Sequence, residues 1–422
     1  MAEAAFGVQL RRSRQAAALS LRQLATRVGY DHSYLSQVER GQRPGSAHLA
    51  RLCDRELGTG DTLATAYTLA RPLPQPAGPP SPALLKTQTA GVDVLDTVRR
   101  GLAGSVGKVL QADEWSAVTT DHARDFPVTP LAELLPELTG DLQLLRAEAA
   151  ERSAADGWTP SELAVPAAEL SVLIALTLTG IGRLQAAGRW WRTARAAADS
   201  SAEPRVTSLA RGWEAISGLS ERRPLADLRE LAEDALTLAD RPSCTARALA
   251  ARAQILAQLD RPDDARRTLQ DLLAVTDDLP ARPGGATSLF DWSEYKTSWV
   301  EGLVQAALGE TDPAYLALDR ALALCPAGSL RERAELELVL ARCLVLDGEV
   351  AAGLAVAMRV LVELPDQWHT HYLYEAAGRV LSVVQGKDLG RAAVRDYREL
   401  LVRRPYHNRS VGSGSSSGWP QG

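Results

Sequence analysis

The sequence is poor in lysine, cysteine and aromatic residues. Of its 47 basic residues only four are lysines, so arginine provides nearly all of the positive charge. The 4 cysteines are far apart in the chain, and no two have the Cys-x-x-Cys spacing that zinc and redox sites use. We therefore expect reduced, buried cysteines, as in cytosolic proteins, and no disulfide framework.

Sequence motifs that are typical of enzymes are also absent. The chain has no glycine-rich phosphate loop and no Gly-x-Ser-x-Gly nucleophile turn. His369 and His371 are two residues apart, so on a helix they diverge and make a poor metal pair. We expect no catalytic residues, no cofactor and no metal, and an enzyme is the least favoured class of function.

Long apolar runs are missing as well. The most apolar stretch, residues 170–181, is too short to span a bilayer, and the N-terminus lacks the apolar run of a signal peptide. These features predict a soluble cytoplasmic protein, associated with the nucleoid and without a membrane partner.

Positive charge is concentrated at the N-terminus. Residues 1–60 contain nine arginines against five acidic residues, a net charge of +4, whereas the whole chain has −5. The remaining residues therefore have −9. A basic head on an acidic body fits a head that contacts phosphate groups and a body that does not.

The first 70 residues have the pattern of five short helices, in a chain whose composition favours helix throughout. They are expected over residues 5–17, 20–29 and 31–41, from about 46, and over about 62–69. Ser20 and Gln23 form a capping box at the start of the second helix, and Gly29 ends it. Asp31 caps the third helix after a very short turn. Two short helices joined this tightly are the helix-turn-helix signature.

The third helix has two different faces. Leu35 and Val38 are three residues apart and point to the same side. The opposite face has hydrogen-bonding side chains, one cation and no acid: His32, Ser33, Ser36, Gln37 and Arg40. A helix that lies in the major groove of DNA needs such a surface.

Residues 19–44, LSLRQLATRVGYDHSYLSQVERGQRP, resemble the lambda- and Cro-repressor-like (XRE) helix-turn-helix family. The matching features are a Leu-Ala pair in the second helix, the turn glycine Gly29, and a Ser-x-x-Glu-x-Gly ending at Ser36, Glu39 and Gly41. In that family the third helix lies in the major groove, and its N-terminal residues contact base edges.

This resemblance assigns roles position by position. The base-reading residues are His32, Ser33 and Gln37, and the Gln37 amide can pair with N6 and N7 of adenine. The residues expected to face phosphates are Ser20, Leu21, Ser36, Arg40, Gln42 and Arg43. Arg14 matches an arginine that pairs with the glutamate matched by Glu39, so this pair is structural. The alternative for Ser33 and Gln37 is that they are ordinary solvated side chains.

A proline-rich stretch separates the head from the rest of the chain. Residues 71–83, RPLPQPAGPPSPA, cannot continue a helix and form an extended spacer. We therefore expect a head over 1–70, a linker over 71–83, a helical repeat domain over 84–404, and a disordered Gly/Ser-rich tail over 405–422.

Small and apolar residues repeat within the body. The clearest two copies align with a shift of 39 residues, which places Gly302, Ala314 and Pro326 on Ala341, Gly353 and Pro365. A third copy covers 253–272, and a looser one surrounds 187–191. The pattern resembles the tetratricopeptide repeat (TPR), which stacks into a superhelix with a concave face. The segment from Gly188 also resembles actinomycete regulators that join such a head to a repeat body.

Two groups of side chains in the body have alternative interpretations. Trp292, Tyr295 and Trp299 share one helical face, which favours core packing between repeats, although they would also suit a ligand wall in the concave groove. Trp191 and Arg192 belong to an arginine-rich segment that, if it lines the groove, would suit a carboxylate-bearing ligand.

These patterns predict an all-α protein with a five-helix head and a TPR-like superhelical body. We predict a sequence-specific transcriptional regulator that binds double-stranded DNA at a near-palindromic operator, as a homodimer held mainly by the body. One alternative is a receptor for a peptide or small-molecule effector in the repeat groove, with DNA binding as its output. The other is a protein–protein adaptor that does not bind DNA.

Overall fold

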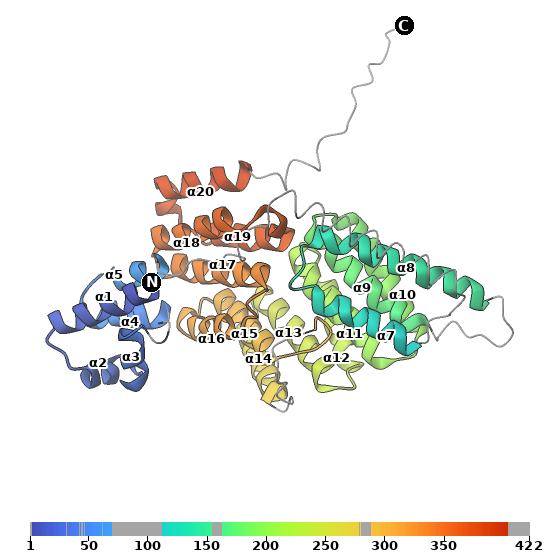
Figure 1. Ribbon diagram of the computed structural model, residues 1–422, viewed down its shortest axis with the longest axis horizontal. Coiled ribbons are helices and arrows are strands. Elements are labelled where there is room, and N and C mark those ends of the chain that lie inside the picture. The colour runs from blue at the N-terminus through green and yellow to red at the C-terminus, as the bar shows by residue number, and fades with distance from the viewer. Residues whose placement is uncertain are drawn as a thin grey trace, which may run out of the picture.

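The structure is a computed structural model that describes residues 2–30, 32–41, 43, 45, 47–60, 62–69, 112–153, 163–277, 279 and 288–403. Every element among these residues is a helix, which confirms the all-α prediction (Figure 1). Asp31 and Gln42 lie outside the described residues, as do the predicted linker 71–83 and tail 405–422. The domain limits therefore remain a prediction.

The head contains the five predicted helices: α1 (Ala2–Ala16), α2 (Leu21–Val28), α3 (His32–Glu39), α4 (Ala47–Leu57) and α5 (Thr62–Leu69). The capping box of Ser20 and Gln23 is present, and Gly29 ends α2 in the left-handed conformation with φ 69°. The side chains that share the core are at most 2% exposed: Phe6, Leu10, Leu24, Leu35 and Val38. The apolar spacing of the sequence thus specifies the packing of the head.

The body is a stack of antiparallel helical hairpins, preceded by α7 (Ala112–Asp125) and α8 (Leu131–Ser153) (Figure 1). The hairpins pair α9 (Ala164–Gly180) with α10 (Leu184–Ser200), α11 (Pro204–Ser220) with α12 (Leu225–Thr237), α13 (Pro242–Gln258) with α14 (Pro262–Asp277), α15 (Glu294–Leu308) with α16 (Thr311–Leu324), α17 (Leu330–Leu346) with α18 (Val350–Glu363), and α19 (His371–Ser382) with α20 (Ala392–Arg403). The 3-10 helices η2 (Asp366–Trp368) and η3 (Gly386–Asp388) lie on either side of α19.

The turns of the hairpins repeat more regularly than the sequence does. From α9 to α18, each turn passes through one residue with positive φ: Gly182, Arg222, Asp260, Gly309 and Gly348. Glycine adopts this conformation without a steric cost, whereas other residues do so at a cost of about 1–2 kcal/mol. The clearest copies in the sequence, α15 to α18, have the glycine. Arginine and aspartate replace it in the turns after α11 and α13.

Small residues permit the close helix packing that the repeat predicts. A Cβ atom on Gly302 would lie 2.7 Å from a methyl group of Leu318 in the paired helix. A Cβ atom on Gly353 would lie 2.6 Å from the carbonyl oxygen of Ala341. Both distances are too short for a side chain, so these positions require glycine.

Helices far apart in the sequence also meet. α19 packs against α9 and α11. The Tyr372 hydroxyl lies 3.2 Å from both the Leu176 carbonyl oxygen and the Ser217 hydroxyl, and His371 Nε2 lies 2.9 Å from the Ser220 carbonyl oxygen. The late hairpins therefore contact the early ones and enclose a space between them.

All four cysteines are buried thiols outside any disulfide, as predicted. Across the part of the chain that the structure describes, no helix is both long and apolar enough to cross a membrane.

Candidate functional site

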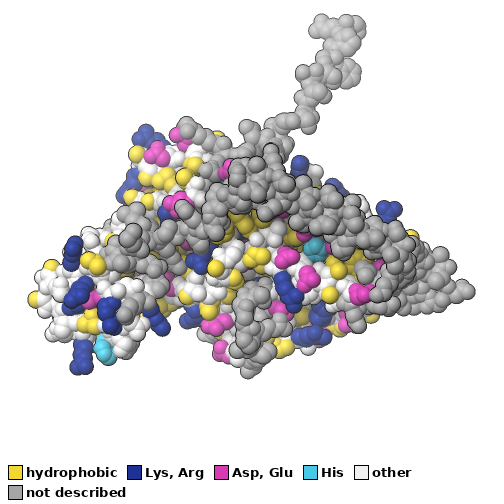
Figure 2. All heavy atoms as spheres, in the orientation of Figure 1, with side chains coloured by type: hydrophobic (Ala, Val, Ile, Leu, Met, Phe, Trp, Pro, Cys, Tyr) yellow, Lys and Arg dark blue, Asp and Glu magenta, His cyan; other side chains and the backbone are white. Residues whose placement is uncertain are grey.

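Helix α3 keeps its apolar side inward and exposes the side predicted to face DNA. Leu35 and Val38 are 0% and 1% exposed and pack in the core of the head. His32 and Ser33 are exposed, and Gln37 is half-buried one turn further on. Figure 2 shows a histidine and several basic side chains at the end of the head where α2 and α3 lie. The three predicted base-reading residues therefore share one accessible face.

The acid of α3 is turned away from this face. Glu39 is 8% exposed, and its two carboxylate oxygens accept hydrogen bonds from Arg14 Nε at 2.6 Å and Nη2 at 2.7 Å. Arg14 also donates from Nη1 to the Leu19 carbonyl oxygen at 2.9 Å. The hydrogen bond to Glu39 raises the pKa of Arg14. This bidentate pair ties α1 to α3 and leaves the outer side of α3 without negative charge.

The residues assigned to phosphates surround α3. The Ser20 hydroxyl accepts from the Gln23 backbone N–H at 3.2 Å, so it caps α2, and Leu21 follows it half-buried. Ser36 is half-buried, and Arg40 donates from Nε to the Ser36 carbonyl oxygen at 3.1 Å. Arg43 is exposed beyond the end of the helix. Their contacts with DNA remain predictions.

The head is attached to the body between α4 and α16. The Arg51 guanidinium lies 3.3 Å from the centroid of the Tyr315 ring and forms an ion pair with Asp347. Asp347 also accepts from the Tyr315 hydroxyl at 2.9 Å and from the Thr311 hydroxyl at 2.6 Å. One arginine of the head thus contacts an aromatic ring and a carboxylate of the body.

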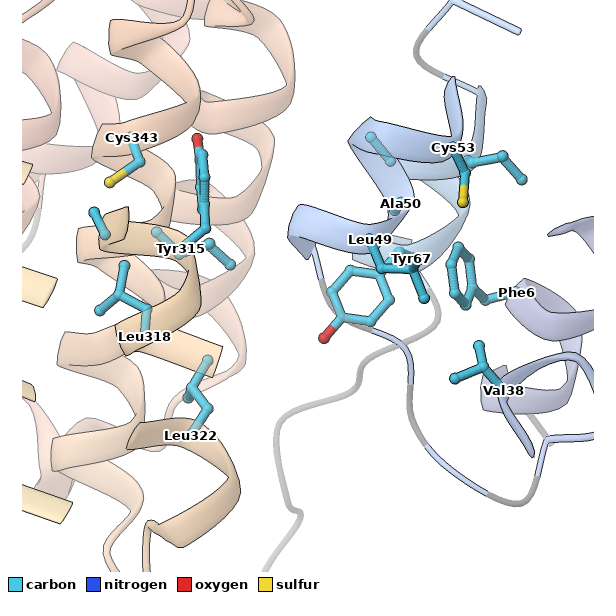
Figure 3. Close-up of a cluster of buried hydrophobic side chains, with 14 of the residues drawn as sticks. Phe6, Val38, Leu49, Ala50, Cys53, Tyr67, Tyr315, Leu318, Leu322 and Cys343 are labelled. Atoms are coloured by element: carbon cyan, nitrogen blue, oxygen red, sulfur yellow. The ribbon is translucent and has the colours of Figure 1, made fainter. Parts of the chain in front are cut away.

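Apolar contacts reinforce this attachment. A single cluster of buried side chains includes the core of the head and residues of α15, α16 and α17. Figure 3 shows its two parts, with Phe6 and Tyr67 in the head and Tyr315 and Leu318 in the body. Sequence reasoning treated head and body as separate and missed this connection, because neither Arg51 nor Tyr315 belongs to a recognisable motif.

The space enclosed by the body is a cavity of about 450 Å³. Most of its wall comes from the first helix of each hairpin, α9, α11, α13, α15, α17 and α19, and the rest from Phe126, Leu289 and Trp292 outside these helices. One part of the wall is aromatic and contains Trp213, Trp292 and Trp299. The size and the apolar lining are those of a small-molecule site.

Charged residues occupy another part of the cavity wall. The cations are Arg331, Arg342 and Arg379, and the acids are Glu332, Glu335 and Glu375. Lys296 also lines the cavity, but its ammonium group donates to the carbonyl oxygens of Ser288 at 2.9 Å, Leu289 at 3.3 Å and Asp291 at 2.7 Å. Burial and the charge of Arg247 lower the pKa of Lys296 to about 7. This lysine fixes the segment before α15 and has no donor left for a ligand.

The predicted groove residues divide into two groups. Trp292 and Trp299 line the cavity, while Tyr295 lies behind it and donates from its hydroxyl to Glu332 at 3.2 Å. The structure corrects the assignment of Trp191 to the groove, because this side chain is 0% exposed and its Nε1 donates to Glu221 at 3.1 Å. Arg192 is exposed on α10 and does not line the cavity. α10 is the outer helix of its hairpin, so neither Trp191 nor Arg192 reaches the cavity.

Sequence reasoning missed Trp213, Arg342 and Arg379. A signal was available in α17, where Arg331, Glu335, Leu338 and Arg342 are spaced i, i+4, i+7 and i+11 and all line the cavity. When charged residues share a helix face with buried apolar residues, that face is expected to line a cavity.

Comparison with known proteins identifies the head. Residues 5–66 match the family described as a helix-turn-helix domain. No curated protein is similar enough to count as a relative. The N-terminal unit is therefore a helix-turn-helix domain.

Two solved structures align over most of the chain. The apo form of the competence regulator ComR from Streptococcus vestibularis is 11% identical, with a TM-score of 0.30, over 84% of this chain and 99% of that one. Selenomethionine-labelled phAimR is 8% identical, with a TM-score of 0.34, over 94% of this chain and 100% of that one. At such scores the alignments do not define a common arrangement of helices.

Proposed function

We propose that this protein is a sequence-specific DNA-binding transcriptional regulator of the XRE type, with a body of tetratricopeptide character that controls the head. His32, Ser33 and Gln37 read bases in the major groove, and residues around them hold phosphates. Two chains bind as a homodimer to a near-palindromic operator whose half-sites are about one helical turn apart.

The outer face of α3 is the observation that supports DNA binding most strongly. It presents polar side chains to solvent, while Glu39, the acid of this helix, is withdrawn into a bidentate pair with Arg14. The DNA phosphate backbone repels exposed carboxylates, whereas many protein partners tolerate them. The burial of the Glu39 carboxylate therefore favours DNA as the partner of this face. An adaptor that no longer binds DNA would have no need to keep this face free of acid.

The cavity favours control by a ligand over constitutive binding. Trp299 and Leu303 line the cavity and also pack against the apolar cluster that includes the core of the head. A ligand that moves α15 would act on α16 and on the Tyr315–Arg51 contact next to it. Binding energy in the body can thereby shift the position of the head.

Selection of genomic fragments by the purified full-length protein tests this function. We expect enrichment of fragments that share a near-palindromic sequence, and a steep loss of binding as salt rises. Retention of no fragment at low salt would reject DNA binding and favour the adaptor. Retention without a shared sequence would reject base reading.

A further inference from the structure

Two cations on the cavity wall, Arg342 and Arg379, form no ion pair among the described residues, although the charge of Glu375 acts on Arg379. Arg342 forms no ion pair there, and its Nε atom is buried without a hydrogen bond. Arg379 donates only a long hydrogen bond of 3.4 Å to the Leu219 carbonyl oxygen. Burial and the charge of Arg379 lower the pKa of Arg342, so the two guanidinium groups act on each other.

Several partly buried arginines elsewhere in the body form ion pairs. Arg195 and Arg223 both contact Glu214 at 2.8 Å, and Arg359 contacts Glu337 at 2.8 Å. Taking a cation out of water costs several kcal/mol unless a partner compensates it. Arg342 lacks this compensation, as does the buried Arg247, which donates to the Phe290 carbonyl oxygen.

The buried side-chain atoms of the cavity lining that lack a hydrogen bond are all donors. They are Trp213 Nε1, Arg331 Nη1 and Arg342 Nε. Each unpaired buried donor costs about 1–3 kcal/mol. These donors lie beneath the cavity surface, so a ligand relieves this cost only if it supplies acceptor atoms and the side chains turn toward it.

The acids of the cavity do not fill this need. Glu332 accepts from the Tyr295 hydroxyl at 3.2 Å, and Glu375 pairs with Arg222 at 3.0 Å. Burial raises the pKa of Glu335 to about 8, so this side chain holds a proton near neutral pH. The charge of Glu375 also acts on Arg379, so the excess of positive charge is clearest at Arg342.

We propose that the cavity binds an organic anion with an apolar body, its carboxylate held between Arg342 and Arg379 and its body against Trp213, Trp292 and Trp299. Two guanidinium groups suit the planar carboxylate, and the indole rings suit an aromatic or aliphatic body. A small carboxylic acid and the C-terminus of a short apolar peptide share this chemistry. The proposal depends on the proposed function in one respect, namely that the body controls the head.

Binding of matched acids and amides to the full-length protein tests this site. The first pair is 1-naphthaleneacetate and 1-naphthaleneacetamide, and the second is the tripeptide Leu-Leu-Trp with a free or an amidated C-terminus. Calorimetry measures affinity in the absence of DNA, so a failure of operator binding does not affect the result. We expect at least one acid to bind about tenfold or more tightly than its own amide. The pair that shows the preference identifies the source of the carboxylate.

Variants locate the anion. Arg342→Met and Arg379→Met should each abolish the preference for acid over amide, while the matched control Arg398→Met, exposed on α20, should retain it. If a methionine variant does not fold, Arg342→Lys keeps the charge without the planar fork and should lose most of the preference. Failure of both acids to bind at millimolar concentration, equal binding of acid and amide, or a preference that survives both methionine variants would overturn the proposal.

Discussion

The outer face of α3 and the wall of the body cavity both present polar or positively charged groups, but they are built in opposite ways. The α3 face comes from one helix of eight residues and is open to solvent. The cavity wall comes mainly from six helices and spans residues from Phe126 to Arg379. A local motif specifies the first surface, and only the assembled fold specifies the second.

The two surfaces also differ in how their charges are satisfied. In the head, Arg14 and Glu39 neutralise each other, and His32 and Ser33 of α3 are exposed to solvent. In the cavity, Arg342 and Trp213 keep donors buried without partners. An open face suits a large, hydrated ligand such as DNA. A concave wall with buried, unpaired donors suits a small ligand.

The largest expected effect concerns the ion pair that orients α3. Arg14→Ala should destabilise the head by about 3–5 kcal/mol, because it leaves Glu39 buried without its partner. Denaturant unfolding with hydrogen exchange of the head helices measures the loss. The double variant Arg14→Met with Glu39→Leu should recover most of it. Arg22→Ala, exposed on α2, should change stability by less than about 0.5 kcal/mol. Similar small effects of Arg14→Ala and Arg22→Ala would contradict the structural role.

Loss of Arg51 should separate the two regions without damaging either. Arg51→Ala removes the Tyr315 and Asp347 contacts, which together should hold the head by about 1–2 kcal/mol. Small-angle scattering should show a more extended particle, while the melting of the body stays unchanged. Arg55→Ala, exposed on the same helix, is the control. An unchanged scattering profile for Arg51→Ala would show that the apolar cluster alone holds the head.

Glu335 should give the body a pH dependence that the head lacks. Because burial raises its pKa to about 8, the folded protein keeps a proton that the unfolded chain releases. Stability should therefore fall as pH rises from about 5 to 8, with a slope below about 1.4 kcal/mol per pH unit. Glu335→Gln should flatten this slope, and Glu363→Gln, exposed on α18, should not. Identical slopes for the two variants would exclude Glu335 as the cause.

The smallest effect is expected at Arg192. Since this side chain is exposed on an outer helix and does not line the cavity, Arg192→Ala should leave stability and the affinity for the naphthaleneacetate probe unchanged. Calorimetry with the variant measures both. A loss of affinity would restore the earlier assignment of the arginine-rich segment to the groove.

Much of the head could be predicted because its signals are local. A capping box, a turn glycine and apolar residues at helical spacing fix α2 and α3, and Leu35 and Val38 are buried as expected. The cavity could not be predicted in this way. Trp191 and Trp292 are both tryptophans in a repeat, and only the pairing of hairpins decides that Trp191 enters the core and Trp292 reaches the cavity.

The binding of Gln37→Ala to DNA tests the central account most directly. The variant and the wild-type protein are titrated with the selected operator and with a scrambled duplex of the same length at several salt concentrations. We predict a loss of about 1–3 kcal/mol on the operator and a much smaller loss on the scrambled duplex. Arg43→Ala, as a phosphate contact, should weaken both and reduce the salt dependence. Equal losses for Gln37→Ala on the two duplexes would contradict base reading by α3.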